Sequence, residues 1–261
     1  MDSVKRSADL PLTVRPVVGM SDLYHAGYVD AYHSHERAQL SYALSGVMSV
    51  ATDETTFVLP PNRAIWLPAG TRHQVSCRGE VELNLLYIDP DLPGQPAGCR
   101  VFDVPLLAHA LIQEILTFEH EYDESGREGR IVRLLVEEIQ RMPPVPLSAP
   151  MPRDRRLRRV CDQIIADPSD QRDLDELAKV AGMGRRTFTR SFREETGMAF
   201  AMWRQQIRLM SAISMLGEGR SITNIAYDVG YESPSSFTAM FHRVLGVAPS
   251  AYARSKASLT S

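Results

Sequence analysis

The sequence predicts an α+β protein of two domains, an antiparallel β-barrel with two helices followed by an all-helical domain that contains a helix-turn-helix twice. Three observations predict this fold class. Short alternating or apolar segments, broken by Gly, Pro and Asp, extend from Thr13 to Ile88. A proline-rich stretch at residues 143–152 then interrupts the chain. Finally, one helical pattern occurs twice between Asp173 and Tyr252.

Length, composition and charge are consistent with two domains. The chain has 261 residues, of which 44% are hydrophobic and 23% are charged, as is typical of globular proteins. The net charge of −3 is unevenly distributed. Residues 1–150 hold 12 Lys+Arg and 20 Asp+Glu, a net charge of −8, whereas residues 151–261 hold 17 and 12, a net charge of +5. We therefore expect only the C-terminal half to bind a polyanion.

Cysteine usage and hydropathy predict the compartment. Cys77, Cys99 and Cys161 are odd in number and widely spaced, so they indicate neither a disulfide framework nor a C-x-x-C pair. The N-terminus lacks the apolar segment of a signal peptide, and no stretch reaches the roughly 18 apolar residues of a membrane helix. We expect a cytoplasmic protein without a membrane partner.

The N-terminal half of the sequence predicts a short disordered segment followed by a β domain. Residues 1–12 are polar and predict disorder, and residues 13–100 show strand-length segments with no helical period between them. This spacing favours an all-β sandwich or barrel, of which a small antiparallel barrel is our choice. Tyr42, Met48 and Trp66 are expected to line an interior pocket for a small, partly aromatic or apolar effector. Ordinary core packing of these three side chains is the alternative.

Histidines with close spacing predict a metal site in the β domain. His33 and His35 are separated by one residue, Gln39 follows, and His73 lies further along the chain. On a strand, His33 and His35 point to the same side, and a neighbouring strand would bring His73 beside them. Three imidazoles and one amide oxygen would then converge on a divalent metal ion. Alternatively, the histidines fill the barrel mouth and form hydrogen bonds there without a metal.

This spacing resembles the two motifs of the cupin family, H-x-H-(x)3-E-(x)6-G and P-x-G-x-x-H. The second is matched by P-A-G-T-R-H, and the first by His33, His35 and Gly46, with Gln39 in place of the usual Glu. Because a neutral amide replaces a carboxylate, we expect weaker binding of a dication. The resemblance implies that residues 13–100 form a cupin-like domain that senses a small molecule or a metal.

Residues 101–142 predict two amphipathic helices, from Val104 to Tyr122 and from Arg127 to Met142. Their apolar positions are Leu107, Leu111, Ile115 and Phe118 on the first helix, and Ile131, Leu134 and Leu135 on the second. Packing of both helices against their own barrel is the simplest expectation. Residues 143–152 contain five prolines, which exclude a helix and predict an extended linker at the domain boundary.

Each copy of the C-terminal repeat predicts a helix-turn-helix. A first helix with apolar residues at i, i+3 and i+4 ends at a glycine, and a second helix then places two phenylalanines inward at i and i+4. Gly182 and Gly230 are 48 residues apart, whereas Phe192 and Phe241 are 49 apart, so the second copy has one additional residue at the turn. The other inward positions are Leu174, Leu177, Ala178 and Phe188 in the first copy, and Ile222, Ile225, Ala226 and Phe237 in the second.

The outer faces of the two second helices differ in charge. The first carries Arg185, Arg186, Thr187, Thr189, Arg190 and Arg193. These groups suit phosphates and guanine edges, although a solvated basic face is the alternative. In the second copy, Ser233 is the expected N-cap and Pro234 the first helical residue. Its outer face is nearly uncharged and consists of Ser235, Ser236, Thr238, Ala239 and His242. We therefore expect the first copy to discriminate bases more strongly.

The repeat resembles the DNA-binding domain of AraC/XylS-type transcription regulators, most specifically in I-A-Y-D-V-G-Y-E-S-P-S-S-F and the terminal G-x-x-P-x-x-Y. The resemblance implies a DNA-binding domain at residues 153–256, in which a linking helix near Phe200–Leu216 presents both recognition helices to successive major grooves. It places base contacts at Arg186, Thr189 and Arg190, and at Pro234, Ser235, Thr238 and Ala239. Many relatives carry Arg at the position of Ala239, so its absence weakens the expected base reading by the second copy.

The same resemblance implies a regulator that binds double-stranded promoter DNA as a homodimer through residues 101–142, and that contacts RNA polymerase if it is an activator. The segments around His33 and Trp66 resemble most the regulators of neighbouring efflux-transporter genes. A metal-dependent cupin enzyme fused to a DNA-binding module is the alternative from another class, but only Glu36 offers an acid–base partner. An architectural DNA binder with an inactive barrel is a third interpretation. We predict a regulator that is not an enzyme.

Overall fold

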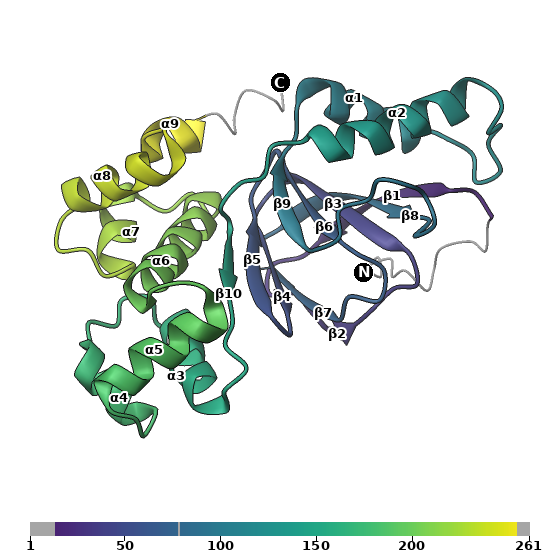
Figure 1. Ribbon diagram of the computed structural model, residues 1–261. Coiled ribbons are helices and arrows are strands. Elements are labelled where there is room, and N and C mark those ends of the chain that lie inside the picture. The colour runs from purple at the N-terminus through teal and green to yellow at the C-terminus, as the bar shows by residue number, and fades with distance from the viewer. Residues whose placement is uncertain (1–13, 78, 255–261) are drawn as a thin grey trace. The chain divides into compact units, whose positions relative to one another are not determined.

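The computed structural model describes residues 14–77 and 79–254 (Figure 1). Its contacts divide the chain into two units, residues 1–52 with 59–146, and residues 53–58 with 147–261. The predicted disordered segment 1–12 lies outside the described residues, as do the last two residues of the predicted domain 153–256. No sequence pattern indicated that residues 53–58 group with the C-terminal half.

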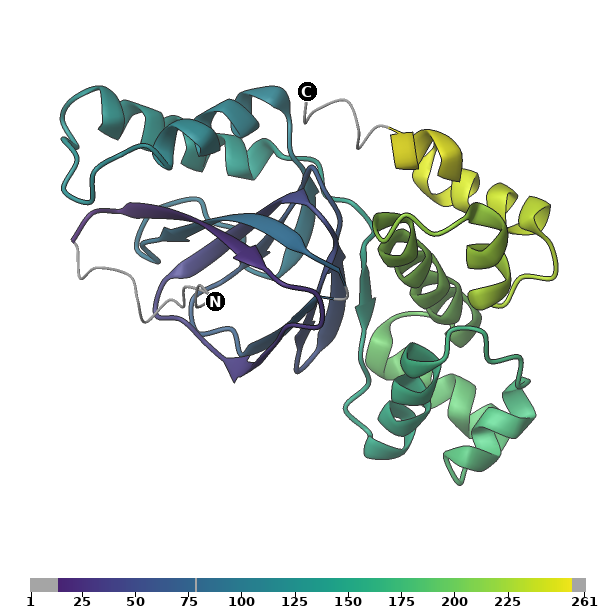
Figure 2. The same cartoon turned by 180° about the vertical axis from the view of Figure 1, so that it is seen from behind.

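Antiparallel strands form two facing sheets in the N-terminal unit (Figure 2). Its strands are β1 (Val17–Tyr24), β2 (Val29–His33), β3 (Ala38–Ser45), β4 (Met48–Thr52), β6 (Arg63–Leu67), β7 (His73–Cys77), β8 (Val81–Ile88) and β9 (Arg100–Asp103). One sheet has the order β1-β8-β3-β6-β9. In the other, β7 pairs with β2 on one side and β4 on the other. The predicted antiparallel β fold is therefore confirmed, as a sandwich of two sheets.

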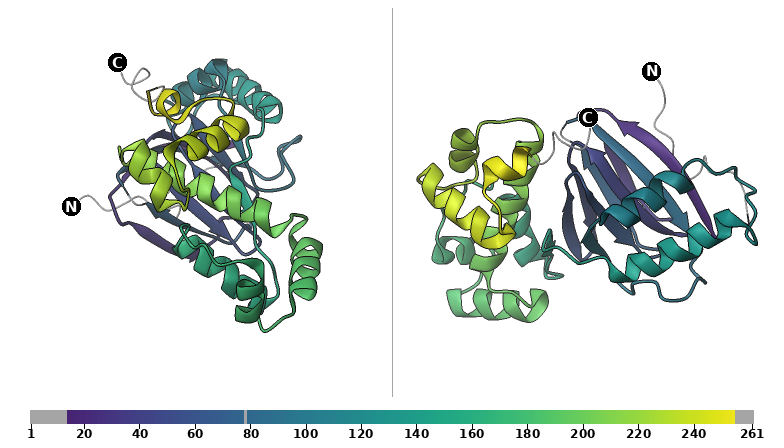
Figure 3. Two further views of the ribbon diagram at one scale, coloured as in Figure 1. Left: turned by 90° about the vertical axis from the view of Figure 1, so that its left-hand side faces the viewer. Right: turned by 90° about the horizontal axis from the view of Figure 1, so that it is seen from above.

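Alternation along β3 separates the two faces of its sheet. Successive strand residues point to opposite faces, so Gln39 and Ser41 share one face while Leu40 and Tyr42 share the other. Leu40 and Tyr42 belong to an apolar cluster that includes buried residues of α1 (Leu106–Ile115) and α2 (Arg127–Arg141). These helices cover the outer face of the sheet (Figure 3). Gln39 and Ser41 consequently face the interior between the sheets.

The first predicted helix, Val104–Tyr122, is too long. Helix α1 begins only after Pro105, its N-cap residue, and ends at Ile115. Proline has a fixed φ and no N–H to donate, which suits the start of a helix but not its interior. Leu107 is 49% exposed, and Ala108 and Ile112 are buried instead. The second helix agrees with its predicted bounds to within one residue.

The predicted linker contains a short strand. Residues Ser148–Pro150 form β10, which pairs antiparallel with β5 (Thr55–Leu59) and places Ala149 opposite Thr56. Ala149 is buried. Proline at the end of an edge strand is tolerated because its missing N–H falls outside the ladder. The segment thus holds no helix, as predicted, but it is paired rather than an unsupported spacer.

Helices make up most of the C-terminal unit. They are α3 (Arg155–Ala166), α4 (Leu174–Val180), α5 (Arg185–Thr196), α6 (Phe200–Gly217), α7 (Ile222–Asp228), α8 (Pro234–Leu245) and α9 (Pro249–Arg254). Figure 1 shows α6 between the pair α4/α5 and the pair α7/α8. The predicted double helix-turn-helix with a linking helix is therefore confirmed.

Buried aromatic residues hold each helix-turn-helix together. Phe188 and Phe192 of α5 are fully buried, as are Phe237 and Phe241 of α8. The ring centroids of Phe192 and Trp203 of α6 lie 5.8 Å apart in an edge arrangement, which favours aromatic contact beyond simple burial. With both phenylalanines of each recognition helix turned inward, the opposite face of that helix is left to solvent.

Helix α8 begins as the sequence predicts. Ser233 is its N-cap, and Pro234 is its first residue. The Ser233 hydroxyl oxygen accepts a hydrogen bond from Ser236 N at 3.2 Å. We expect Ser233→Ala to lower the free energy of unfolding by about 1 kcal/mol, because one N–H at the helix start loses its partner. Urea denaturation would measure the change. Ser235→Ala is the matched control and should change stability by no more than about 0.5 kcal/mol; equal losses in both variants would contradict a capping role.

Candidate nucleic-acid interface and histidine cluster

The outer face of α5 is basic and exposed. Arg186, Arg190 and Arg193 are exposed, and Thr189 lies among them. Arg185 is partly neutralised, because its Nη1 forms an ion pair with Oδ2 of Asp175 at 2.9 Å. Thr189 Oγ1 lies 3.1 Å from the Arg185 carbonyl oxygen and 3.2 Å from the Arg186 carbonyl oxygen, so its hydroxyl proton is used within the helix.

The guanidinium groups of Arg186 and Arg190 on this face have most of their N–H donors available. Arg190 Nε lies 3.9 Å from Oε1 of Glu194, a long ion pair on an exposed surface. Exposed pairs of this kind are weak, so a phosphate or a guanine edge can replace Glu194 at little cost. Arg186 and Arg190 are thus placed to make bidentate contacts with an anion or a base. Thr187, at the leading edge of the same helix, is also exposed.

The outer face of α8 is uncharged and shaped differently. A shallow depression is lined by Pro234, Ser235, Thr238, Ala239, His242 and Ala248. Ser236 Oγ donates to the Ser233 carbonyl oxygen at 2.8 Å, and the hydroxyls of Ser233 and Ser235 lie 3.0 Å apart. These local bonds occupy part of the hydrogen-bonding capacity of the serines. The surface suits sugar–phosphate and methyl contacts better than bidentate base contacts.

Three histidines converge in the N-terminal unit. His33 on β2 is the register partner of His73 on β7, and their ring centroids lie 4.4 Å apart. The His35 ring lies 4.8 Å from that of His33 and 5.2 Å from that of His73. The structure thus brings together the three predicted imidazoles.

His35 reaches the cluster by a different route from the one predicted. Strand β2 ends at His33, so His35 lies in the following loop and not on the same strand. The carbonyl oxygen of His35 accepts a hydrogen bond from Gly70 N at 2.8 Å, within the segment P-A-G-T-R-H. The Thr71 carbonyl oxygen of that segment binds Nδ1 of His73 at 2.9 Å. The second motif therefore positions two of the three rings through its backbone.

Backbone contacts also determine which ring nitrogens face the cluster. A carbonyl oxygen only accepts, so Nδ1 of His73 carries the proton, as does Nδ1 of His33, which lies 2.7 Å from the Ala31 carbonyl oxygen. The Nε2 atoms of both rings then present lone pairs. Burial lowers the pKa of His35 to about 4, with repulsion from His73 and His33 adding to the effect, and burial also lowers the pKa of His73. These two imidazoles are therefore neutral at pH 7, the form that binds a metal.

Several buried polar atoms at this place have no protein partner. Within residues 14–77 and 79–254, His35 Nδ1, Gln39 Oε1 and His73 Nε2 are buried without a partner at hydrogen-bond geometry, although Gln39 lies near enough to His35 to oppose the lowering of its pKa. Such atoms are costly unless a water, an ion or a ligand satisfies them. Candidate ligand atoms of the three histidines lie within 4.8 Å of one another. Since metal–nitrogen bonds are about 2.0–2.1 Å long, the rings must approach slightly to share one ion, but the donor set fits a divalent metal.

The predicted pocket residues separate into two places. Tyr42 and Trp66 lie in the apolar cluster beneath α1 and α2, so their placement in the barrel interior was wrong. The Tyr42 hydroxyl lies 2.8 Å from Nδ1 of His109, and Trp66 Nε1 donates to the Pro96 carbonyl oxygen at 2.9 Å. The physical reason is the two-residue period of β3, which places Tyr42 on the face opposite to Gln39.

Met48 does lie on the interior face. It is buried on β4 and shares a face of that strand with Val50 and Thr52, and Thr52 is the register partner of His73. Residues paired across strands share a face, so Met48 and His73 face the same interior. Met48 therefore remains a candidate for contact with a ligand in the barrel.

Two side chains beside the histidines were not predicted. The Tyr87 ring lies 5.3 Å from that of His35, and Tyr87 is the register partner of Gln39. An Asp30 carboxylate oxygen lies 3.6 Å from Nδ1 of His33. Strand β8 gave no signal for Tyr87 because nearly all of its residues are buried, which hides the alternation. For Asp30, the available indication in the sequence was its position three residues before His33.

No helix in the part of the chain that the structure describes has both the length and the apolar character needed to cross a membrane.

Known proteins match both halves of the chain. A family model described as a helix-turn-helix domain matches residues 177–255, and one described as a cupin domain matches residues 22–89. The HTH-type transcriptional regulator NimR of Escherichia coli (strain K12) is 27% identical over 231 residues, 87% of this chain and 85% of NimR. The HTH-type transcriptional regulator RipA of Corynebacterium glutamicum is 33% identical over 218 residues, 82% of this chain and 61% of RipA.

Similarity to solved structures is weaker. A structure of ToxT from Vibrio cholerae with a bound unsaturated fatty acid aligns with 94% of this chain and 97% of ToxT. The identity is 14% and the TM-score is 0.39, too low to support an argument about fold or function.

Proposed function

The chain belongs to the AraC family of helix-turn-helix transcription regulators and carries an N-terminal cupin domain, and we propose how its recognition helices bind DNA and what its cupin domain senses. It binds double-stranded promoter DNA in a sequence-specific manner through α5 and α8. Arg186, Thr189 and Arg190 contact base edges, with Arg185 and Thr187 beside them at the phosphates. On α8, Pro234, Ser235, Ser236 and Thr238 contact the backbone and thymine methyl groups.

The observation that carries this proposal is the exposed basic face of α5. Its inner face is fixed by Phe188 and Phe192, so Arg186 and Arg190 cannot turn inward. Two guanidiniums one helical turn apart suit adjacent bases in a major groove. Fixed backbone contacts from α8 would set the register of α5 along the duplex.

The cupin domain senses a small molecule or a metal. His33, His35 and His73, with Gln39 beside them, would hold a divalent ion, which would supply positive charge and open coordination positions to an effector. Without a metal, the same unpartnered polar atoms would bind an organic effector, with Met48 as part of the pocket wall. In either case, the effector shifts the population of states in which the DNA-binding domains are presented to the promoter.

Gln39 provides a test of the metal alternative. We expect Gln39→Glu to increase the affinity for Zn²⁺ or Co²⁺ by about tenfold, because a carboxylate adds negative charge and a hard oxygen ligand. Isothermal titration of the purified protein would measure this affinity. Gln39→Leu is the control, which removes the oxygen and should weaken binding. Unchanged affinity in both variants would show that Gln39 is not a ligand.

A homodimer through residues 101–142 is the proposed assembly. Leu106 and Leu107 of α1 are 79% and 49% exposed, and Leu134 of α2 is 38% exposed. Leucines exposed on neighbouring helices suit an interface with a second copy. We further propose the domain limits given by the sequence, with a sensor at 13–100 and a DNA-binding domain at 153–256. We also propose that the protein is cytoplasmic and controls a neighbouring efflux-transporter gene. If it activates transcription, it contacts RNA polymerase.

An enzyme fused to a DNA-binding module is not supported. NimR and RipA are HTH-type transcriptional regulators, and both align with the two halves of this chain. Glu36, the acid–base candidate from the sequence, lies in the loop between β2 and β3. An architectural DNA binder with an inactive barrel differs from the proposed regulator in one testable respect. No ligand of the barrel would change its DNA binding.

A mobility-shift assay with the gene's own upstream region tests the proposal. Full-length protein would be titrated at fixed salt with Zn²⁺, with a chelator and with neither, against scrambled DNA of the same length. Specific binding that responds to the metal supports a metal-dependent sensor. Specific binding that does not respond supports an organic effector, and absence of specific binding contradicts the regulator itself.

A further inference from the structure

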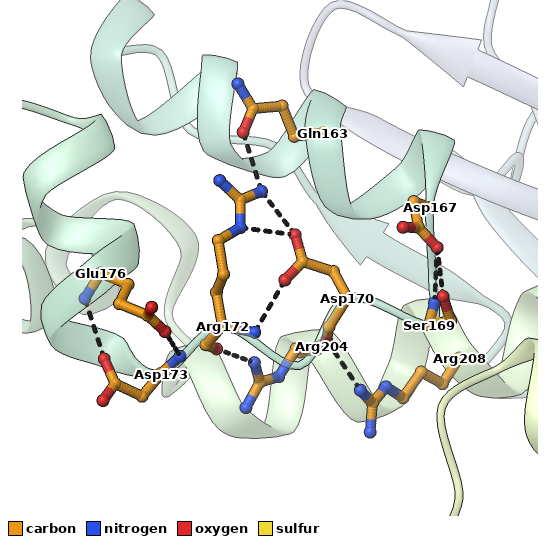
Figure 4. Close-up of polar contacts among 9 residues, drawn as sticks. All are labelled: Gln163, Asp167, Ser169, Asp170, Arg172, Asp173, Glu176, Arg204 and Arg208. Carbon is orange, nitrogen blue, oxygen red and sulfur yellow. Dashed lines mark hydrogen bonds and ion pairs between the residues drawn. The ribbon is translucent and has the colours of Figure 1, made fainter.

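The two helix-turn-helix pairs are joined by more than the continuity of α6. The loop of residues 167–173 connects α3 to α4, and Asp173 at its end is the N-cap of α4. The turn of the second pair comprises residues 229–233, between α7 and α8. Side chains connect this loop, α6 and this turn, and Figure 4 shows those that surround the loop.

Arg208 of α6 binds the backbone of the loop. Its Nε donates to the Pro168 carbonyl oxygen at 3.0 Å. Its Nη2 donates to the Asp170 carbonyl oxygen, also at 3.0 Å (Figure 4). Arg204, one turn earlier on α6, donates from Nη1 to the Arg172 carbonyl oxygen at 2.8 Å. A guanidinium presents donors in a rigid fork, so two carbonyls held by Arg208 are fixed relative to α6.

The loop is also rigid within itself. Arg172 Nε donates to Oδ2 of Asp170 at 2.8 Å, and its Nη2 donates to Oε1 of Gln163 on α3 at 2.9 Å. Asp167 Oδ1 accepts from Ser169 N at 3.0 Å. Because the loop leads directly into α4, fixing the loop on α6 fixes where α4 begins, and α5 follows α4 by a short turn.

The same groups contact the turn of the second pair. Gln171 Nε2 donates to the Gly230 carbonyl oxygen at 2.8 Å, and the Arg208 guanidinium lies over the Tyr231 ring at 5.7 Å from its centroid. Gly230 has a φ of +78°, and a Cβ there would lie 2.7 Å from Nη2 of Arg208 and 2.9 Å from Nε2 of Gln171. A side chain at residue 230 would therefore displace the ends of both side chains, in addition to the strain of this backbone conformation.

We propose that Arg208 and Gln171 form a clamp that fixes the separation of the recognition helices α5 and α8, and thereby the spacing between the two half-sites that the domain accepts on DNA. This inference rests on the proposed function, because it assumes that both helices enter the duplex. Arg208 is a positioning residue, since it acts through the loop and the turn and touches no base. The consequence is that specificity resides partly in the geometry between the two helices, at residues remote from the bases.

Selection of binding sites from a random duplex library tests the clamp directly. Full-length wild type and Arg208→Ala would each be used to select sites from random 30-base-pair duplexes over several rounds at one salt concentration. For each DNA-binding domain of wild type, we expect the recovered sites to contain two short motifs at one separation, about one helical turn, or 10–10.5 base pairs, centre to centre. The variant should recover the same two motifs at several separations.

Binding measurements on the selected site quantify the effect. Arg208→Ala should bind the wild-type spacing about tenfold more weakly, because two half-sites joined by a loose linkage gain less effective concentration. Inserting two base pairs should weaken wild type by about 30-fold but the variant by less than about fivefold. Gln171→Ala should show the same change to a smaller extent.

Arg204→Ala is the matched control, because it removes a bond to the same loop from the same helix and leaves the second turn untouched. It should keep the single separation. Circular dichroism and urea denaturation would establish that every variant is folded. An unchanged separation in Arg208→Ala, or loss of either motif from a folded variant, overturns the clamp. Failure of wild type to select any motif contradicts the proposed function itself, which separates the two outcomes.

Discussion

Replacing both Arg186 and Arg190 by alanine is expected to weaken binding to the specific DNA site by about 2–6 kcal/mol, the sum of two bidentate base contacts of about 1–3 kcal/mol each. Both guanidiniums project from the solvent face of α5, whose opposite face is held by Phe188 and Phe192. Stability should change by no more than about 0.5 kcal/mol, because neither side chain is buried. Fluorescence anisotropy on the selected site and on scrambled DNA would measure the loss.

The control must remove the same charge elsewhere. Arg100→Ala/Arg130→Ala removes two exposed positive charges from the N-terminal unit and should leave both affinities within about twofold. The salt dependence separates the roles. A pure phosphate contact lowers the affinity for all sequences equally and reduces the salt slope by about 1 for each arginine. If the double variant loses specific and non-specific affinity in equal proportion, the base-reading role of α5 is wrong.

The C-terminal half was predictable because its information is local. Each helix is marked by its own period, the turns by Gly182 and Gly230, and the start of α8 by Ser233 and Pro234. All of these signals act within a few residues, so the structure reproduces them. The clamp was not predictable, since Arg208 and Gln171 are separated from Gly230 by many residues and meet only in the folded domain.

The N-terminal half was predictable as a class and less so in detail. The antiparallel strands and the convergence of His33 and His73 follow from alternation and motif spacing. The placement of Tyr42 in the interior failed although alternation itself excludes it, because Gln39 and Tyr42 are an odd number of residues apart on one strand. The pairing of β10 with β5 depends on long-range contacts that a proline-rich sequence does not indicate.

The polar atoms of a histidine cluster in a barrel can be satisfied by water, an organic ligand or a metal. Substituting one histidine has a different effect on stability and on metal affinity in each case. A structural histidine contributes mostly to stability. A metal ligand contributes to affinity for the ion and to the stability gained when the ion binds. The unpartnered Nε2 of His73 makes this the residue at which the two roles are most clearly separated.

His73→Ala is therefore expected to lower the affinity for Zn²⁺ or Co²⁺ by more than about 100-fold, beyond the loss typical of an outer-shell change. The ring is buried, its Nδ1 is committed to the Thr71 carbonyl oxygen, and its Nε2 faces His33 and His35. Co²⁺ absorption and isothermal titration would measure the affinity, and His25→Ala, which alters an exposed histidine of the same unit, should leave it unchanged. Thermal unfolding with and without Zn²⁺ adds an independent measure, because wild type should gain stability from the ion and His73→Ala should not. If wild type binds neither ion, the buried nitrogens serve an organic effector, and the same variant should then abolish the effect of that molecule on DNA binding.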